Sequence, residues 1–161
     1  MTLFELIRAF VDKSPVAVLV TDATVRAPGP IILYANGAFG KLTGRDPTEV
    51  IGISPRFMQG RETRRPVLDH FAQALAAGEP FHGFLTNYRA DGTKYVVEID
   101  CRPLRNADGR IEHFLSFERE VARRLGRPSR DGASRFEPVE VSNDLLGEEL
   151  RRLRVFSAAG E

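Results

Sequence analysis

Hydrophobic residues recur at helical spacing near both ends of the chain, and they alternate with polar residues over much of its middle. The spacing predicts amphipathic helices over residues 2–11 and 144–156. The apolar positions that we expect to form the faces of these two helices are Leu3, Leu6, Phe10, Leu146, Leu150 and Leu153. Each face is too long to leave in water, so it must cover the sheet, form a dimer seam or dock a partner.

Along the central region, the hydrophobic pattern begins as short apolar runs, continues with helical spacing, and ends with apolar and polar residues in alternation. The predicted strands lie at residues 16–20, 31–34, 81–89, 95–101 and 111–121. Asp91-Gly92 marks a hairpin turn between two of them. A longer helix is predicted to open near Thr63 and to end at Gly78, and the Asp46–Glu49 segment resembles another helix start.

This order of elements predicts an α+β fold, a five-stranded antiparallel sheet with short helices on one face, plus flanking N- and C-terminal helices. We divide the chain into an N-terminal cap helix at 1–13, a central domain at 14–122, a flexible linker at 123–141 and a C-terminal amphipathic helix at 142–161. The linker prediction rests on the Arg, Gly, Pro and Ser content of that segment.

Composition narrows the function classes. The chain has 161 residues, 42% hydrophobic and 28% charged, with a formal net charge of +1. A net charge this close to zero does not favour binding to nucleic acid. No apolar run is nearly as long as a membrane-spanning helix requires. The single cysteine, Cys101, is expected to be a small buried residue, and no Cys/His spacing indicates a metal site. We expect a cytoplasmic protein.

Two motifs carry a family resemblance. Residues 52–60 read GISPRFMQG and residues 87–93 read NYRADGT. They resemble the light-oxygen-voltage (LOV) branch of the PAS sensory domains, whose first motif is close to GxNCRFLQG. In that branch the cysteine attacks a photoexcited flavin. The resemblance implies a PAS fold over about residues 15–121, and it places Pro55 at the cysteine position and Ser54 at the asparagine position. A cysteinyl photoadduct at Pro55 is chemically impossible.

The resemblance also assigns candidate ligand residues one position at a time. Arg56 matches a flavin-phosphate arginine, Gln59 the glutamine of the first motif, and Asn87 a ring-binding asparagine. These three are our cofactor-binding candidates, conditional on a flavin-like ligand. The positions where the match is lost are Ser54, Pro55, Ala72, Val97 and Glu118, although Arg64 or Arg65 could replace the second phosphate arginine. A site with several missed polar partners loses about 1–3 kcal/mol for each, so no tightly bound cofactor is expected, with FMN or FAD as the possible alternative.

Three functions remain open. The first is a single-domain PAS adaptor that acts by protein–protein contact, as a homodimer, on histidine kinases or regulators of a two-component network. The second is a small-molecule, redox or light sensor that binds a flavin non-covalently. The third is a transcriptional regulator, for which the C-terminal segment supplies only one helix. The chain carries no catalytic motif, so we expect no enzyme activity.

Overall fold

An antiparallel sheet forms the centre of the computed structural model, which describes residues 1–126 and 135–157. Five strands lie in the spatial order β2-β1-β5-β4-β3, and a short strand β6 pairs with β5. The strands are β1 Ala17–Asp22, β2 Ile32–Ala35, β3 Phe81–Tyr88, β4 Lys94–Arg105, β5 Ile111–Arg123 and β6 Phe136–Pro138. The helices are α1 Leu3–Val11, α2 Gly37–Thr43, the 3-10 helix η1 Pro55–Met58, α3 Arg65–Ala77 and α4 Leu145–Arg152. The predicted fold class is confirmed.

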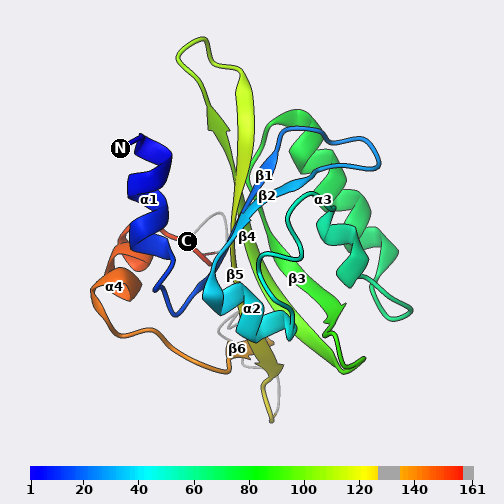
Figure 1. Ribbon diagram of the computed structural model, residues 1–161. Coiled ribbons are helices and arrows are strands. Elements are labelled where there is room, and N and C mark those ends of the chain that lie inside the picture. Colours follow the sequence, from blue (N-terminus) through cyan, green and yellow to red (C-terminus); the bar gives the residue numbers. More distant parts are fainter. Residues whose placement is uncertain (127–134, 158–161) are drawn as a thin grey trace.

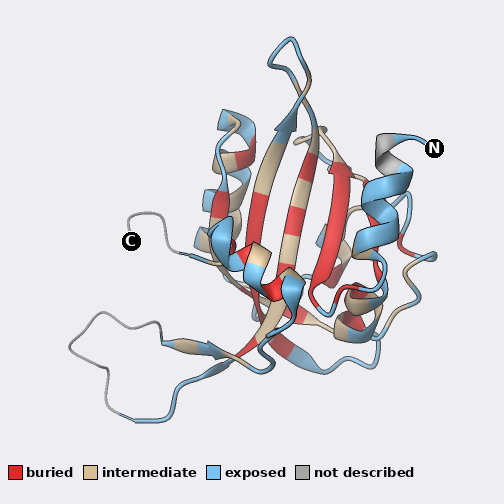
Figure 2. Cartoon of the chain, turned by 90° about the vertical axis from the view of Figure 1, so that its left-hand side faces the viewer, coloured by how far each residue is buried: buried red, intermediate tan, exposed pale blue. Residues whose placement is uncertain are grey.

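The two faces of the sheet are covered by different helices. Since successive residues of a strand point to opposite faces, the alternation along β3, β4 and β5 separates an inner from an outer set. On the inner face, Leu85, Val97, Ile99 and Phe114 pack toward α3, which contributes Leu75 to the same cluster. Helix α3 lies on one side of the sheet, and α1 and α4 lie on the other (Figure 1). Buried residues gather along the central strands (Figure 2).

The outer face carries a smaller apolar layer. Val18, Val20 and Tyr34 are buried there, and Val11 at the end of α1 packs against them. Beyond α4, Val155 is also buried, and together with Leu150 it forms a separate cluster on the sheet around the β1 flank. The outer face is therefore partly covered by the chain's own ends.

Asn36 ties β1, α1 and α2 together. Its side-chain oxygen accepts from the backbone N–H groups of Val18 (2.9 Å) and Phe39 (3.1 Å), and its amide donates to the carbonyls of Val11 and Val16, each at 2.9 Å. The contact with Phe39 is the N-cap of α2. With an exposed fraction of 1%, this side chain uses its full amide capacity inside the fold.

One predicted helix start is wrong. The Asp46–Glu49 segment forms turns rather than a helix. The Asp46 carboxylate accepts from the backbone N–H and the hydroxyl of Thr48 at 2.9 and 2.8 Å, so the capping signal is used within the turn itself. Gly52 then reverses the chain with a positive φ of 88°, and its N–H donates to the carbonyl of Ile32. The segment therefore returns to the edge of β2.

The C-terminal third also departs from prediction. The predicted linker at 123–141 contains β6, whose Phe136 ring stacks on Phe84 at 4.7 Å, and residues 127–134 of that range lie outside the described residues. The predicted C-terminal helix ends at Arg152 rather than at Phe156. Arg154 and Phe156 adopt positive φ angles of 57° and 63°, which a helix cannot continue through. This turn places Val155 on the sheet.

Candidate functional site

A cavity of about 180 Å³ lies between the inner face of the sheet, η1 and α3. It has room for far more than a single water molecule, which needs about 10–15 Å³ in the same measure. Its walls are mostly apolar, with a few polar side chains on the sheet. The polar side chains that the strands contribute are Thr21, Asn87, Ser116 and Glu118. Such a cavity is typical of a small-molecule site.

The η1 segment forms one rim of this cavity. Ser54 caps it by accepting from the backbone N–H of Arg56, and Pro55 occupies its first turn, where no donor is required. Met58 is buried beneath the rim. The Arg56 guanidinium donates to the backbone carbonyls of Gly29 at 3.1 Å and Val25 at 3.2 Å. Arg56 thus fastens the loop before β2 to the rim.

All three candidate ligand residues border the same cavity. Arg56 and Gln59 lie on the η1 rim, and Asn87 projects from the inner face of β3. Asn87 is buried, whereas Arg56 and Gln59 are exposed at the opening. The spatial grouping agrees with the sequence motifs. Their binding role stays a prediction.

At two positions where the family pattern has a polar residue, Val97 and Ala72, this chain has an apolar side chain beside the cavity or in its wall. Val97 is fully buried within the apolar cluster that contains Leu85 and Phe114. Ala72 lines the cavity on α3 and offers no charge. Arg65, about two turns earlier, also lines it, and its Nε lies 2.9 Å from the Asp69 carboxylate. Arg65 is therefore the α3 arginine that reaches this rim.

Glu118 is the most unusual group in the cavity wall. It is 4% exposed, and its Oε2 is a buried atom without a hydrogen-bond partner in the part of the chain that the structure describes. The strand register sets it between Ala17 on β1 and Ile99 on β4, both buried and apolar. Burial raises the pKa of Glu118 from 4.5 to about 7. Near neutral pH this side chain can therefore carry a proton to donate.

Cys101 is buried, as expected, but it also lines the cavity. It lies on the inner face of β4 directly opposite Ser116 of β5. Burial raises the pKa of the thiol to about 12, with the Glu118 carboxylate acting in the same direction. The thiol is therefore neutral at physiological pH and is a weak nucleophile. The sequence motifs do not indicate that Cys101 lines the cavity, because this depends on how β4 pairs with its neighbouring strands.

The second region of interest is the outer sheet face with its two flanking helices. On α1, Leu6 and Phe10 are 43% and 74% exposed, and the side chain of Leu3 lies outside the described residues. In the C-terminal segment, Leu153 is 57% exposed and Leu145 is 74% exposed. Of the predicted interaction residues, Leu6, Phe10 and Leu153 are therefore exposed enough to contact a partner.

The other two predicted interaction residues, Leu146 and Leu150, pack within the chain itself. Leu150 is 7% exposed and contacts the cluster that contains Val16 and Val155, and Leu146 is partly buried against the same cluster. Part of the α4 face thus covers the sheet, which was one of the alternatives for this helix.

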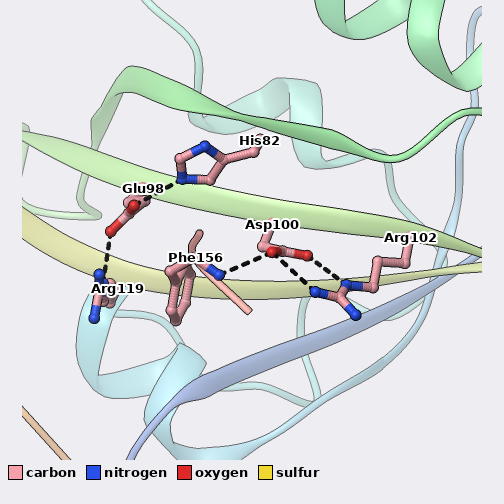
Figure 3. A network of polar contacts seen from close by, with 6 residues as sticks. All are labelled: His82, Glu98, Asp100, Arg102, Arg119 and Phe156. Carbon is pink, nitrogen blue, oxygen red and sulfur yellow. Dashed lines mark hydrogen bonds and ion pairs between the residues drawn. The ribbon is translucent and has the colours of Figure 1, made fainter. Parts of the chain in front are cut away.

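Polar contacts hold the end of the C-terminal segment on the outer face (Figure 3). The backbone N–H of Phe156 donates to the Asp100 carboxylate at 2.8 Å, and the same carboxylate pairs with Arg102 at 2.8 Å. The Arg119 guanidinium lies 4.3 Å from the centre of the Phe156 ring and pairs with Glu98 at 2.6 Å. Both carboxylates are buried, so these charge-assisted contacts are shielded from solvent.

Within the described residues, no cluster of His, Cys, Asp and Glu side chains is arranged to hold a metal ion. No helix there is long and apolar enough to cross a membrane.

Comparison with known proteins identifies the domain. A family model for the PAS domain matches residues 15–123. The chain belongs to the PAS domain family, in its LOV branch. The bacterioopsin transcriptional activator of Halobacterium salinarum is 32% identical to this PAS domain over 114 residues, which cover 71% of the chain and 17% of that protein. The blue-light-activated histidine kinase of Brucella canis is 34% identical over 120 residues, covering 74% of the chain and 24% of the kinase.

Solved structures agree with this assignment. An RNA-binding light-oxygen-voltage receptor is similar with a TM-score of 0.67 and 30% identity, over 73% of this chain and 33% of the receptor. The chain spans about a fifth of the length of the curated relatives that it matches. The shared part is a sensory signalling domain of kinases and regulators.

Proposed function

We propose that this PAS domain signals by protein–protein contact through its flanking helices, acting on histidine kinases or regulators of a two-component network. The observation that carries this proposal is the apolar surface left on the outer side of the sheet. Phe10, Leu145 and Leu153 expose more than half of their side chains there, next to segments that are already docked on the sheet. Exposed apolar groups gathered on flanking helices are typical of a contact surface.

The signalling does not use a cysteinyl–flavin adduct. By the motif match, Pro55 on the η1 rim takes the position of the family's reactive cysteine, and its side chain has no nucleophilic atom. The chain's own cysteine, Cys101, holds a neutral thiol in the opposite wall. The module has no catalysis of its own and forms a homodimer through α1 and the C-terminal segment.

A matched set of variants tests this proposal. Phe10→Asp and Leu153→Asp place a charge on the exposed apolar surface, and Ile51→Asp places one on another exposed apolar residue, in the connection between α2 and η1. We expect the first two to convert the dimer to a monomer in light scattering, and to abolish the change in autophosphorylation of a purified histidine kinase carrying a PAS sensor. Ile51→Asp should change neither. A protein that is monomeric before substitution, and that leaves the kinase unaltered, would contradict the proposal.

A second function is supported by the cavity. We propose that it binds a planar heteroaromatic ligand of the flavin class non-covalently, and that α1 and the C-terminal segment report its occupancy. Asn87 and Gln59 offer amide donors and acceptors, while the orphaned oxygen of Glu118 requires a partner that the described protein does not supply. Arg56 lies at the opening, where a phosphate can replace the carbonyls that it now contacts. A bound flavin would supply blue-light absorption and electron acceptance.

The absorption spectrum of freshly purified protein, with and without added FMN, tests this second function. A flavin band that survives gel filtration, and that does not bleach into an adduct on illumination, is the expected result. Asn87→Leu should lower the FMN content, whereas Asn106→Leu, in the exposed β4–β5 turn, should not. A colourless protein that takes up no FMN would contradict it and leave the contact function standing.

A further inference from the structure

Glu118 differs from the other buried carboxylates of the sheet in having no counter-charge among the residues that the structure describes. Glu98 and Asp100 on the outer face are each about as buried, and each pairs with an arginine, Arg119 at 2.6 Å and Arg102 at 2.8 Å. Glu118 faces the inner cavity between two apolar side chains. A buried carboxylate without a partner is costly, so the proton and the ligand are the two species that can satisfy it.

The charged and titratable groups around the cavity do not supply that partner. The nearby groups, by element, are Cys101 and Tyr95 on β4, Glu120 on β5, Arg89 after β3, Arg56 on η1, and Arg65 and Asp69 on α3. Burial raises the pKa of both the Cys101 thiol and the Tyr95 hydroxyl, so neither is charged near neutrality.

The arginines near the cavity are already engaged. Arg89 pairs with Glu120 at 2.7 Å, and Arg65 lies 2.9 Å from Asp69. Arg56 contacts backbone carbonyls on the rim. Burial alone accounts for the raised pKa of Glu118, and within the described part of the chain no cation opposes it.

We propose that ligand binding in this cavity is linked to protonation of Glu118. The protonated carboxyl holds a flavin-class ring by donating a hydrogen bond to it, when the ring edge that faces Glu118 carries only acceptor atoms. The inference rests on the second function proposed above. One edge of an oxidised flavin presents only a carbonyl oxygen and an unprotonated ring nitrogen. A carboxylate facing that edge would set acceptor against acceptor, whereas a carboxylic acid donates. Binding then takes up a proton at Glu118. A ligand that presents N–H groups to Glu118 would show the opposite dependence on pH.

Riboflavin is the probe, because it lacks the phosphate whose own titration would obscure the result. We expect its affinity, measured by fluorescence quenching, to fall on the order of tenfold between pH 6 and pH 8.5, as Glu118 loses its proton. Calorimetry in two buffers of different ionisation enthalpy should show proton uptake approaching one per riboflavin at pH 8. Glu118→Gln keeps the size of the side chain and always offers a donor. Its affinity should therefore be independent of pH, with no proton uptake.

The outcomes separate the two proposals. Riboflavin binding that does not change with pH in the wild-type protein, without proton uptake, overturns the role of Glu118 and leaves the ligand cavity intact. Absence of riboflavin and FMN binding in both proteins at every pH overturns the ligand cavity and the proton linkage together. A readout without ligand is the infrared carbonyl band of a protonated carboxylic acid, taken as wild type minus Glu118→Gln. That band should be present at pH 6 and lost by pH 8.5, and its absence at pH 6 overturns the inference.

Discussion

The raised pKa of Glu118 predicts that the ligand-free protein loses stability as the pH rises from about 4.5 to about 7. In the folded state burial holds the pKa at about 7, against an ordinary value of 4.5. Between these values the native protein binds the proton and the unfolded chain does not, so raising the pH favours unfolding. The stabilising contribution is complete below the unfolded pKa and is lost as the pH passes the folded pKa.

The magnitude follows from the size of the shift. Each pKa unit corresponds to about 1.4 kcal/mol, so the full penalty is about 3 kcal/mol, and most of it falls between pH 5 and pH 8. The group is fully buried, so screening by solvent does not reduce this figure substantially. For a domain of this size, such a change shifts the urea midpoint by about 1 M or more.

Urea unfolding of wild type and Glu118→Gln at half-unit intervals from pH 5 to pH 8 isolates this contribution. Other carboxylates titrate equally in both proteins, so the difference in unfolding free energy between them reports on Glu118 alone. The variant should gain about 2–3 kcal/mol relative to wild type across this range. A difference that stays constant with pH would refute the reasoning and show that the carboxylate is solvated or paired.

Three further predictions concern other parts of the fold. Asn36→Ala should lower the unfolding free energy by about 3 kcal/mol or more in urea titrations, because it removes the partner of four backbone groups, three of them in buried residues. A loss below about 1 kcal/mol would show that water replaces the Asn36 side chain. Leu150→Ala should cost about 2–3 kcal/mol of α4 docking and speed amide hydrogen exchange there, leaving β3–β5 amides unchanged; uniform acceleration would contradict a locally docked segment. Val97→Asn should destabilise the ligand-free protein by about 1–3 kcal/mol, since it buries an amide among apolar groups, and should raise riboflavin affinity about tenfold; unchanged affinity would place the ligand away from β4.

The sheet could be predicted from sequence because its signals are local. Alternating apolar residues predict the strands of the β3–β4–β5 meander, and Asp91-Gly92 predicts the turn between the first two; Gly92 indeed adopts a positive φ angle. The clustering of Arg56, Gln59 and Asn87 followed from the family motifs. Neither prediction requires knowing which residues of neighbouring strands pair with each other.

The errors arose where packing overrides local signals. The apolar period through Leu153 and Phe156 suggested a continuing helix, but burial of Val155 on the sheet favours a left-handed turn at Arg154. The β6 strand forms because β5 offers it a pairing edge, which composition cannot reveal. The cavity location of Cys101 likewise depends on which face of β4 is inner.

Strand β5 contributes residues to both proposed functions, because it has one face toward the cavity and the other toward the C-terminal segment. Because neighbouring residues of β5 point to opposite faces, Glu118 enters the cavity, while Phe117 and Arg119 meet the C-terminal segment on the outer face. Glu118→Gln changes the inner side alone and therefore tests the ligand without touching the docking contacts. Arg119→Gln removes the ion pair with Glu98 and the contact with Phe156, and leaves the cavity wall intact. If riboflavin binding to wild type alters the exchange of α4 amides, and Arg119→Gln removes that effect without lowering affinity, then β5 carries the coupling between the two faces.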